Sequence, residues 1–394
     1  KGIVYQLNEQ LRQEAHQVCH ELNQEGMRVL AVAQKSWISK DRDFSVTDEH
    51  EMVLIGFLAF LDPPKSSATE AIKKLHEHGV LVKVLSGDNE AVVKTICRQV
   101  GIDTTYSLNG LDVESLSDEE LKEELKNVTI CSKLTPMQKT RIIKLLQESE
   151  HTVGFLGDGI NDAAALRQSD VGISVDNAVD IAKESADIIL LEKDLMVLED
   201  GVIEGRKTFG NIMKYIKMTA SSNFGNMFSV LAASAFLPFL PMLPIHLLVQ
   251  NLLYDISQTT IPFDTMDPDY LKTPRKWDAS DLKKFMLYIG PISSIFDILT
   301  FVILWFVFAY NSPDQQAFFQ SAWFVEGLLS QTLIVHMIRT RKIPFVQSNA
   351  SWPVTSLTFF IMGVGVILPF TGIGSSIGLV PLPWSYFPWL IGIL

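Results

Sequence analysis

The distribution of apolar and charged residues divides the chain into a polar front and an apolar back. Charged residues are dense through about residue 217 and are then confined to short islands between long apolar runs. A helix needs about 20 apolar residues to cross a bilayer. The pattern therefore predicts a soluble N-terminal part followed by membrane-spanning helices.

The first sixty residues have the pattern of a small α+β domain. Residues 7–25 have the spacing of an amphipathic helix, residues 28–33 have the composition of a strand, and residues 52–61 form a second apolar stretch. We interpret residues 1–60 as the end of such a domain.

Over residues 61–205 the pattern changes to helices that alternate with short, continuously apolar strands. Helices are predicted at 66–78, 91–100 and 137–148, and strands at 80–85 and 152–156. Apolar strands separated by helices indicate a parallel sheet that is covered on both faces. Ligands of such a sheet bind beyond the carboxyl ends of its strands.

Residues 206–394 are predicted to contain six membrane helices, the last of which is cut short at Leu394. Basic residues such as Lys214 and Arg339 flank one end of these stretches, whereas the loop at 310–317 contains no Lys or Arg. By the positive-inside rule, the soluble part and the basic loops share the cytoplasmic side. The apolar stretches lie near 218–240, 243–262, 285–310, 319–338, 352–370 and 382–394.

Composition narrows the functional classes. With 394 residues, of which 47% are hydrophobic, the chain is long enough for two or three domains and apolar enough for membrane spans. Its net charge of -12 argues against nucleic acid as a partner. The cysteines Cys19, Cys97 and Cys131 lie in the polar front without a CxxC pair, which predicts reduced thiols without a functional role. The start lacks both an initiator Met and a signal peptide, so we expect a fragment that begins inside a domain.

The strongest chemical signal is Gly157-Asp158-Gly159-Ile160-Asn161-Asp162, where a predicted strand ends and a helix begins. Two carboxylates four positions apart around small residues can reach one Mg²⁺, and the glycines let a phosphate approach the backbone. The alternative is an ordinary turn in which Asp162 only caps the helix.

Two further elements have positions that suit phosphate chemistry. Ser86-Gly87-Asp88 directly follows a predicted strand, so its hydroxyl and N–H groups would point into the same crevice as Asp158. Lys139, near the start of a helix after Leu134-Thr135-Pro136, would add a positive charge suited to a phosphoryl group. Taken alone, Ser86-Gly87-Asp88 could equally be an ordinary turn, and Lys139 could equally be a solvated surface lysine.

Together these three elements resemble the phosphotransfer core of the haloacid dehalogenase type, and longer strings narrow the resemblance to the P-type ATPases. Asp62-Pro63-Pro64-Lys65 resembles the hinge sequence of that family, and Leu85-Ser86-Gly87-Asp88 resembles its Thr-Gly-Asp motif. The run from Gly157 to Leu166 resembles Gly-Asp-Gly-x-Asn-Asp-Ala-Pro-Ala-Leu. The departures are modest: Ser86 replaces Thr, Lys65 replaces Arg, and Ala164 replaces Pro.

The resemblance implies a domain organisation. Residues 1–60 would be the C-terminal part of an α+β nucleotide-binding domain, and residues 61–205 a haloacid-dehalogenase-like (Rossmann-type) α/β phosphorylation domain. Residues 206–394 would form an all-α transmembrane bundle that contains the fifth to tenth helices of the family. The family's nucleophile lies in Asp-Lys-Thr-Gly-Thr, which this sequence lacks. We therefore expect that aspartate upstream, in a missing N-terminal half with the first four membrane helices and the actuator domain.

The resemblance also implies ATP and Mg²⁺ as cofactors and a role for each motif. Asp158 would bind the catalytic Mg²⁺, with Asn161 and Asp162 completing its surroundings. Positioning and charge neutralisation supply most of the rate in such phosphoryl transfers. The transferred phosphoryl would be held by Ser86, Gly87, Asp88 and Lys139, and the nucleotide would be contacted by Arg28 and Asp62.

Polar side chains in the predicted spans are candidates for a cation site, because they are costly in a membrane. Asn223 and Asn226 lie three apart on one face of the first span, and Asn251 and Asp255 lie four apart on one face of the second. Oxygen ligands of this kind suit a hard cation. The alternative is that the amides bridge helices by hydrogen bonds.

Polar residues in the later spans are weaker candidates. We expect Glu326 near an outer helix end, where solvation or a lipid-headgroup position competes with ion binding, and a packing role for His336. The remaining members of this group are Asp297 and Gln331.

The identity of the cation depends on the resemblance. The absence of membrane cysteines argues against a copper or zinc pump, and the few membrane carboxylates argue against a calcium-pump arrangement. Ser221–Asn226 and Val249–Asp255 resemble the bacterial magnesium-transporting ATPases, which implies Mg²⁺ as the transported cation and the lipids of a bacterial inner membrane as surroundings. A pump for protons or calcium, a membrane-tethered phosphatase and a lipid translocator are the alternatives. The last two leave the polar positions on the helical faces without a reason.

Overall fold

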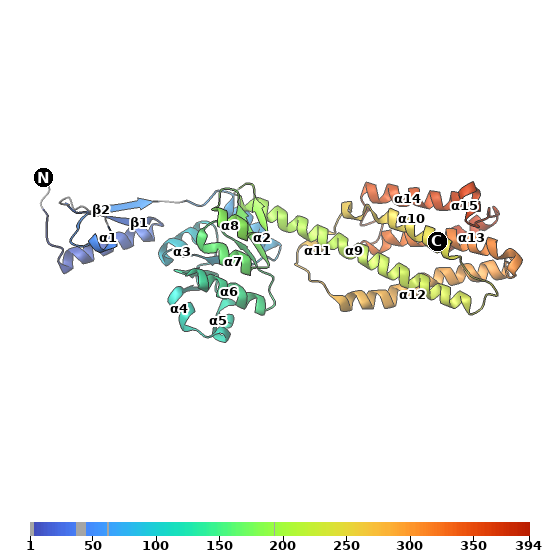
Figure 1. The fold of residues 1–394 in the computed structure, drawn as a ribbon, viewed down its shortest axis with the longest axis horizontal. Coiled ribbons are helices and arrows are strands. Elements are labelled where there is room, and N and C mark those ends of the chain that lie inside the picture. The colour runs from blue at the N-terminus through green and yellow to red at the C-terminus, as the bar shows by residue number, and fades with distance from the viewer. Residues whose placement is uncertain (1–3, 37–44, 61–62, 193) are drawn as a thin grey trace. The chain divides into compact units, whose positions relative to one another are not determined.

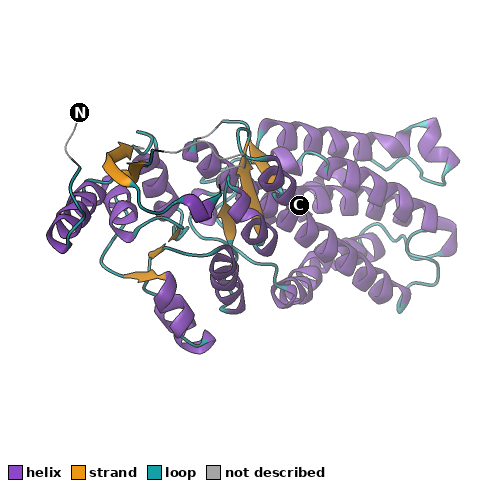
Figure 2. Ribbon diagram, turned by 60° about the vertical axis from the view of Figure 1, so that its left-hand side comes forward, coloured by secondary structure: helices purple, strands orange, loops and turns teal. Residues whose placement is uncertain are grey.

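The computed structural model describes residues 4–36, 45–60, 63–192 and 194–394, and the chain divides into two compact units. Unit 1 comprises residues 1–201 and unit 2 comprises residues 202–394. The described strands all belong to unit 1, and unit 2 is built from helices (Figure 2).

Unit 1 begins with a helix and a two-stranded antiparallel sheet (Figure 1). The side chain of Asn8 caps α1 (Glu9–Gln24) by accepting a hydrogen bond from the N–H of Leu11. A turn at Gly26, whose φ of +86° favours glycine, leads into β1 (Arg28–Gln34). β1 pairs with β2 (Val53–Phe60), and Arg28 lies opposite Phe60. This pairing places Arg28 at the end of the sheet next to the rest of unit 1.

The remainder of unit 1 contains two parallel three-stranded sheets, whereas the sequence predicted a single sheet. The strand orders are β3-β5-β4 and β6-β7-β8, so β3 and β6 are edge strands that do not pair with each other in the described part of the chain. The structure differs from this prediction because no strand of the described residues lies between β3 and β6, and apolar patterning does not show which strands are neighbours. The strands are β3 (Val84–Leu85), β4 (Ser107–Asn109), β5 (Ile130–Ser132), β6 (Gly154–Leu156), β7 (Val171–Val175) and β8 (Ile188–Leu190).

Helices pack around these sheets, and Leu85 joins their cores. It contacts the apolar cluster that includes Phe155 and Ile173, and also the cluster that includes Cys131 and Ile142. The carboxyl end of β3 is thereby held close to both sheets. The helices of this region are α2 (Ala68–Glu77), α3 (Glu90–Gln99), α4 (Gly110–Ser115), α5 (Asp118–Leu125), α6 (Pro136–Glu148), α7 (Ala163–Gln168) and α8 (Asp180–Ser185).

Gly172 on β7 allows the close approach of α7 to the second sheet. A Cβ at this position would lie 2.6 Å from the carbonyl oxygen of Leu166, which is a backbone atom that cannot turn aside. We expect Gly172→Ala to destabilise unit 1 by about 1–3 kcal/mol. Pulse proteolysis in urea on the solubilised protein measures this change. Gly201→Ala is the control, since a Cβ there meets nothing within 4 Å, and an equal loss in both variants would contradict the packing argument.

Two cysteines of unit 1 are buried, and burial raises the pKa of the Cys97 thiol and of the Cys131 thiol to about 11. The thiolate is the reactive form, so both should react slowly at pH 8 and faster as the pH approaches 11. Cys19 is only partly covered. We expect N-ethylmaleimide to modify Cys19 alone in the native protein at pH 8 and all three thiols in urea, as counted by mass spectrometry. Equal native rates for Cys19 and Cys97 would contradict this burial.

Unit 2 is organised around α13 (Gln316–Ile338), which packs against α10 (Pro244–Gln258), α12 (Ala279–Phe306) and α14 (Trp352–Ile367) (Figure 1). Most side chains of α13 between Phe319 and His336 are buried, which makes it the central helix of the unit. The other helices are α9 (Leu195–Ser234), which crosses the boundary between the units, α11 (Pro268–Leu271), α15 (Gly372–Ser376) and α16 (Tyr386–Ile393).

Two helical stretches among the described residues are long and apolar enough to cross a membrane, Ala279–Phe306 and Trp352–Phe370. α10 has 15 residues and α16 has 8, fewer than the roughly 20 of a complete span. α13 has 23 residues but buries several polar side chains. The structure thus contains two of the six predicted spans as long apolar helices. The spans near 218–240, 243–262, 319–338 and 382–394 remain predictions from the sequence.

Candidate functional sites

Loops that leave the carboxyl ends of β3, β5 and β6 line one cavity of about 420 Å³ in unit 1. Two backbone hydrogen bonds hold the first two loops together. The N–H of Leu134 donates to the carbonyl of Ser86 at 3.0 Å, and the N–H of Lys133 donates to that of Asp88 at 2.9 Å. The edge at which the sequence predicted a ligand site is thus formed by loops from both sheets.

Lys139 and Asp162 form a buried ion pair in this cavity. Their Nζ and Oδ1 atoms are 2.8 Å apart, and the side chains are 11% and 14% exposed. A capping box between Thr135 and Gln138 fixes the start of α6, so Lys139 lies on its first turn. The other carboxylate oxygen of Asp162 accepts a hydrogen bond from the N–H of Gly159 at 3.1 Å. Asp162, predicted from the sequence as a magnesium ligand, has both carboxylate oxygens bonded to the protein.

Gly157 makes the tight turn of the loop after β6 possible. A Cβ at this position would lie 2.6 Å from the Cβ of Asp162, so the two residues pack directly on each other. The hydroxyl of Ser174 on β7 donates to the carbonyl of Gly157 at 2.9 Å and fixes the loop to the sheet. Asp158, the next residue, lines the cavity.

The loop after β3 carries a second ion pair. The Ser86 hydroxyl accepts a hydrogen bond from the N–H of Asp88 at 3.1 Å, which closes the turn. Arg28 on β1 reaches the Oδ1 of Asp88 at 2.9 Å, with both side chains well exposed. Exposed pairs contribute about 0–1 kcal/mol, so either group can exchange its partner for a ligand. Asp62, the other residue predicted to contact a nucleotide, lies outside the described residues.

The donor set of this cavity fits Mg²⁺. Asp158 and Asn161 supply the hard oxygen donors that this ion prefers, and Mg²⁺ usually keeps several waters and takes further ligands from a substrate phosphate. Within the part of the chain that the structure describes, no three His, Cys, Asp or Glu side chains gather as a complete metal cage. The positive groups Arg28 and Lys139 lie in the same cavity and suit a phosphate.

The polar residues predicted for a cation site in unit 2 are found in different surroundings. Asn226 on α9 accepts a hydrogen bond from the side-chain amide of Gln331 on α13. Asp255 on α10 lines another cavity, of about 560 Å³, which α9 also lines through Asn211 and Tyr215. Asn223 is exposed and Asn251 is partly buried. Within the described part of the chain, no hydrogen bond joins any two of these four side chains.

The sequence reasoning missed Gln250 and named Gln331 only as a weaker candidate. The side-chain oxygens of Gln250 and Gln331 are buried without a hydrogen-bond partner among the described residues. Glu326, expected near a solvated helix end, is fully buried because it lies in the middle of the central helix α13. Gln250 could have been found, because it directly precedes Asn251 in an apolar run. Asp297 accepts from Ser229 at 2.6 Å and from Trp323 at 2.7 Å, which links α9, α12 and α13.

Comparison with known proteins finds a family match in each of the two units. Residues 2–170 match the family described as haloacid dehalogenase-like hydrolase, and residues 239–394 match the family described as cation transporting ATPase, C-terminus. The chain is also 61% identical, over 94% of its length, to "Magnesium-transporting ATPase, P-type 1" of Salmonella typhimurium strain LT2. The chain belongs to the P-type ATPase family. This membership confirms the phosphotransfer fold and the class of membrane protein that the motifs predicted.

Other P-type ATPases show how far the similarity extends. The protein of the same name from Escherichia coli K12 is 56% identical over 100% of this chain. "Endoplasmic reticulum calcium ATPase srcA" of Aspergillus fumigatus is 31% identical over 77% of it. The chain covers 41%, 44% and 33% of these three relatives, so it spans less than half of each.

Proposed function

We propose that the protein containing this chain is an ATP-driven magnesium transporter that works through an aspartyl phosphate. The observation that carries the proposal is the cavity in unit 1. It gathers Ser86, Asp88 and Asp158 from the loops after β3 and β6, and Lys139 from the first turn of α6. These groups combine hydroxyl, cationic and carboxylate chemistry at one strand edge, as phosphoryl transfer requires. The phosphorylated aspartate itself lies upstream in this proposal, in agreement with the absence of Asp-Lys-Thr-Gly-Thr.

Each residue of the cavity has a proposed task. Lys139 neutralises charge on the phosphoryl group, and its ion pair with Asp162 holds the ammonium group in place. The hydroxyl and N–H groups of Ser86 and Gly87 donate to phosphoryl oxygens, and Arg28 leaves Asp88 to contact the nucleotide. Asp158 and Asn161 hold Mg²⁺, which when bound neutralises phosphate charge.

The unpaired edges of β3 and β6 support the upstream position of the aspartate. Exposed strand edges carry unsatisfied backbone groups, which proteins normally cover. We propose that the segment bearing the aspartate adds a parallel strand at these edges and so brings its carboxylate to the cavity. Residues 1–60 would then belong to the nucleotide-binding domain and residues 61–205 to the phosphorylation domain.

Magnesium is the proposed cargo, and the bacterial inner membrane is the proposed location, with unit 1 in the cytoplasm. The relatives that are 56–61% identical carry magnesium transport in their names, whereas the calcium-transporting relatives are 26–31% identical. Asp255, Asn251, Asn223 and Asn226 are the proposed ligands, with membrane lipids around the helices. Their oxygen atoms suit a hard divalent cation.

The test is ATP hydrolysis by the complete protein in lipid vesicles, titrated with free Mg²⁺, Ca²⁺, Zn²⁺ and protons. Mg-ATP is kept saturating, so any further response to free Mg²⁺ comes from a second site. We expect turnover to follow free Mg²⁺ in this range. Turnover that follows calcium or pH instead would keep the phosphotransfer assignment and overturn the cargo. ATP-independent hydrolysis of small phosphate esters without transport would favour a membrane-tethered phosphatase.

A further inference from the structure

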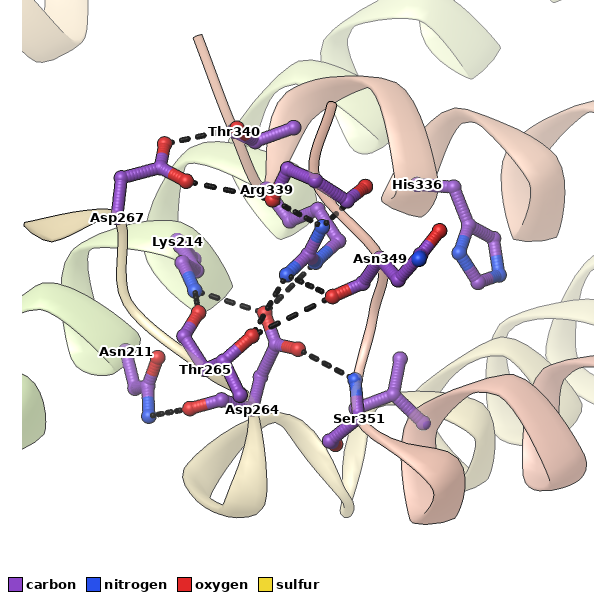
Figure 3. Close-up of polar contacts among 12 residues, drawn as sticks. Asn211, Lys214, Asp264, Thr265, Asp267, His336, Arg339, Thr340, Asn349 and Ser351 are labelled. Carbon is purple, nitrogen blue, oxygen red and sulfur yellow. Dashed lines mark hydrogen bonds and ion pairs between the residues drawn. The ribbon is translucent and has the colours of Figure 1, made fainter. Parts of the chain in front are cut away.

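One buried carboxylate in unit 2, Asp264, binds cationic side chains from two helices (Figure 3). Its Oδ2 atom lies 2.7 Å from the Nζ of Lys214 on α9 and 2.8 Å from the Nε of Arg339, the residue that caps α13. The side chains of Lys214, Asp264 and Arg339 are 7%, 0% and 1% exposed. Asp264 itself follows α10 and the short turn of helix at Ile261–Phe263.

The same three side chains hold the adjoining loops through backbone atoms. The N–H of Ser351 donates to the Oδ1 of Asp264 at 3.1 Å, which adds the start of α14. Lys214 donates to the carbonyl of Thr265 at 2.8 Å, and Arg339 donates to that of Asn349 at 3.0 Å. Figure 3 shows these contacts around the carboxylate of Asp264. Together, Lys214, Asp264 and Arg339 form a buried charge cluster.

The cluster is charged, and its members depend on one another. Burial alone would raise the pKa of Asp264, but hydrogen bonds from Arg339 and Lys214 hold that pKa below its ordinary value. A buried charge that loses its partner is strongly destabilising, whereas surface pairs contribute little. Asp267 lies at the rim of the cluster, where Thr340 and Ser348 donate to it at 2.7 Å and 3.3 Å.

The cluster is connected to the same helices that carry the residues proposed to bind the cation. Lys214 precedes Asn223 by nine positions on α9, which is about 14 Å of helix, and Arg339 follows Gln331 by eight positions, or about 12 Å. Asp264 follows Asp255 by nine positions. α9 and α10, which carry the proposed ligands, and α13, which carries the weaker candidate Gln331, are thus all joined to the same carboxylate.

We infer that Asp264 is a positioning residue, which sets the spacing of α9, α10 and α13 at the cation site and thereby the affinity for the transported ion. This inference rests on the proposed magnesium transport. Displacement of ligand atoms by a fraction of an ångström weakens binding of Mg²⁺, which demands near-ideal octahedral geometry. The groups that transfer phosphate belong to unit 1 and keep their own contacts.

The experiment compares Asp264→Asn with wild type in the complete protein, reconstituted in lipid, under saturating Mg-ATP. The amide removes the charge that holds Lys214 and Arg339 and keeps the size of the side chain. We expect the free Mg²⁺ concentration at half-maximal turnover to rise about tenfold, while maximal turnover changes less than twofold. Asp264→Glu, which restores the charge, should recover part of the affinity. Asp269→Asn, an exposed residue paired with Lys272, is the matched control and should match wild type.

Lys214→Gln is a second variant that tests the inference if Asp264→Asn does not fold. It is expected to be milder, because it leaves the contact between Asp264 and Arg339 in place. It should shift the half-maximal Mg²⁺ concentration in the same direction. Wild-type Mg²⁺ dependence in both Asp264→Asn and Lys214→Gln overturns the inference, as does a fall in maximal turnover at unchanged Mg²⁺ affinity. In either case a Mg²⁺ response in the wild type leaves the proposed function standing. If the wild type itself ignores free Mg²⁺, the proposed function fails and this inference fails with it.

Discussion

Replacement of Lys139 by alanine should lower ATP turnover of the complete protein about a thousandfold. Lys139 is a buried cation of the cavity, and its position is fixed both by the capping box at the start of α6 and by the ion pair with Asp162. A positive group that is held in place where charge develops acts without reorganisation, so its loss falls on the chemical step. Steady-state hydrolysis and phosphorylation by radiolabelled ATP measure the effect.

Lys144→Ala is the matched control for this prediction, since Lys144 lies on the same helix with its side chain 65% exposed. It should leave turnover within twofold of wild type. The binding of a nucleotide should also survive in Lys139→Ala, because the proposed nucleotide contact comes from Arg28 on β1. If Lys139→Ala retained more than a tenth of the wild-type turnover, Lys139 would have no role in phosphoryl transfer. Its only role would then be the ion pair with Asp162.

The position of this cavity could be predicted from sequence because it depends on local features. A turn that directly follows an apolar strand opens at the carboxyl end of that strand, so Ser86 and Asp158 could be assigned to one edge. Lys139 could be placed by the helix start signal of Thr135-Pro136. Its pairing with Asp162 was not predicted, because the two residues are separated by 23 positions and no local rule links them.

Features that depend on distant neighbours were not predictable. Lys214 and Arg339 were counted as basic residues that flank membrane spans, and the structure buries both against Asp264, which is 50 and 75 positions away. A count of charges does not distinguish a solvated lysine from a buried one. The division of the strands into two sheets has the same cause, since strand patterning carries no information on pairing partners. Glu326 was expected near a helix end because its position was judged from the approximate boundary of a predicted span. The structure places it in the middle of α13.

Asp255→Asn should abolish the dependence of turnover on free Mg²⁺ below millimolar concentrations. Asp255 is the carboxylate among the four residues proposed to bind the cation, and it lines the cavity between α9 and α10. At 4 Å and an effective dielectric constant near 20, the attraction between this carboxylate and a divalent ion is about 8 kcal/mol. The cost of desolvating the charges offsets part of this energy, so we expect the affinity to fall at least about a hundredfold. The amide keeps an oxygen at the same place, so the change isolates charge from shape.

Two measurements on Asp255→Asn distinguish the proposed transport from its alternatives. Uptake of Mg²⁺ into vesicles should fall with the affinity, while phosphorylation by ATP remains possible because unit 1 is unchanged. Asp314→Asn, an exposed carboxylate in the turn before α13, should match wild type in both assays and so exclude a general effect of surface charge. A tethered phosphatase or a lipid translocator gives no reason for Asp255→Asn to alter a cation response. Wild-type Mg²⁺ dependence in this variant would therefore contradict the cation site on α10, even if the chemistry of unit 1 were established.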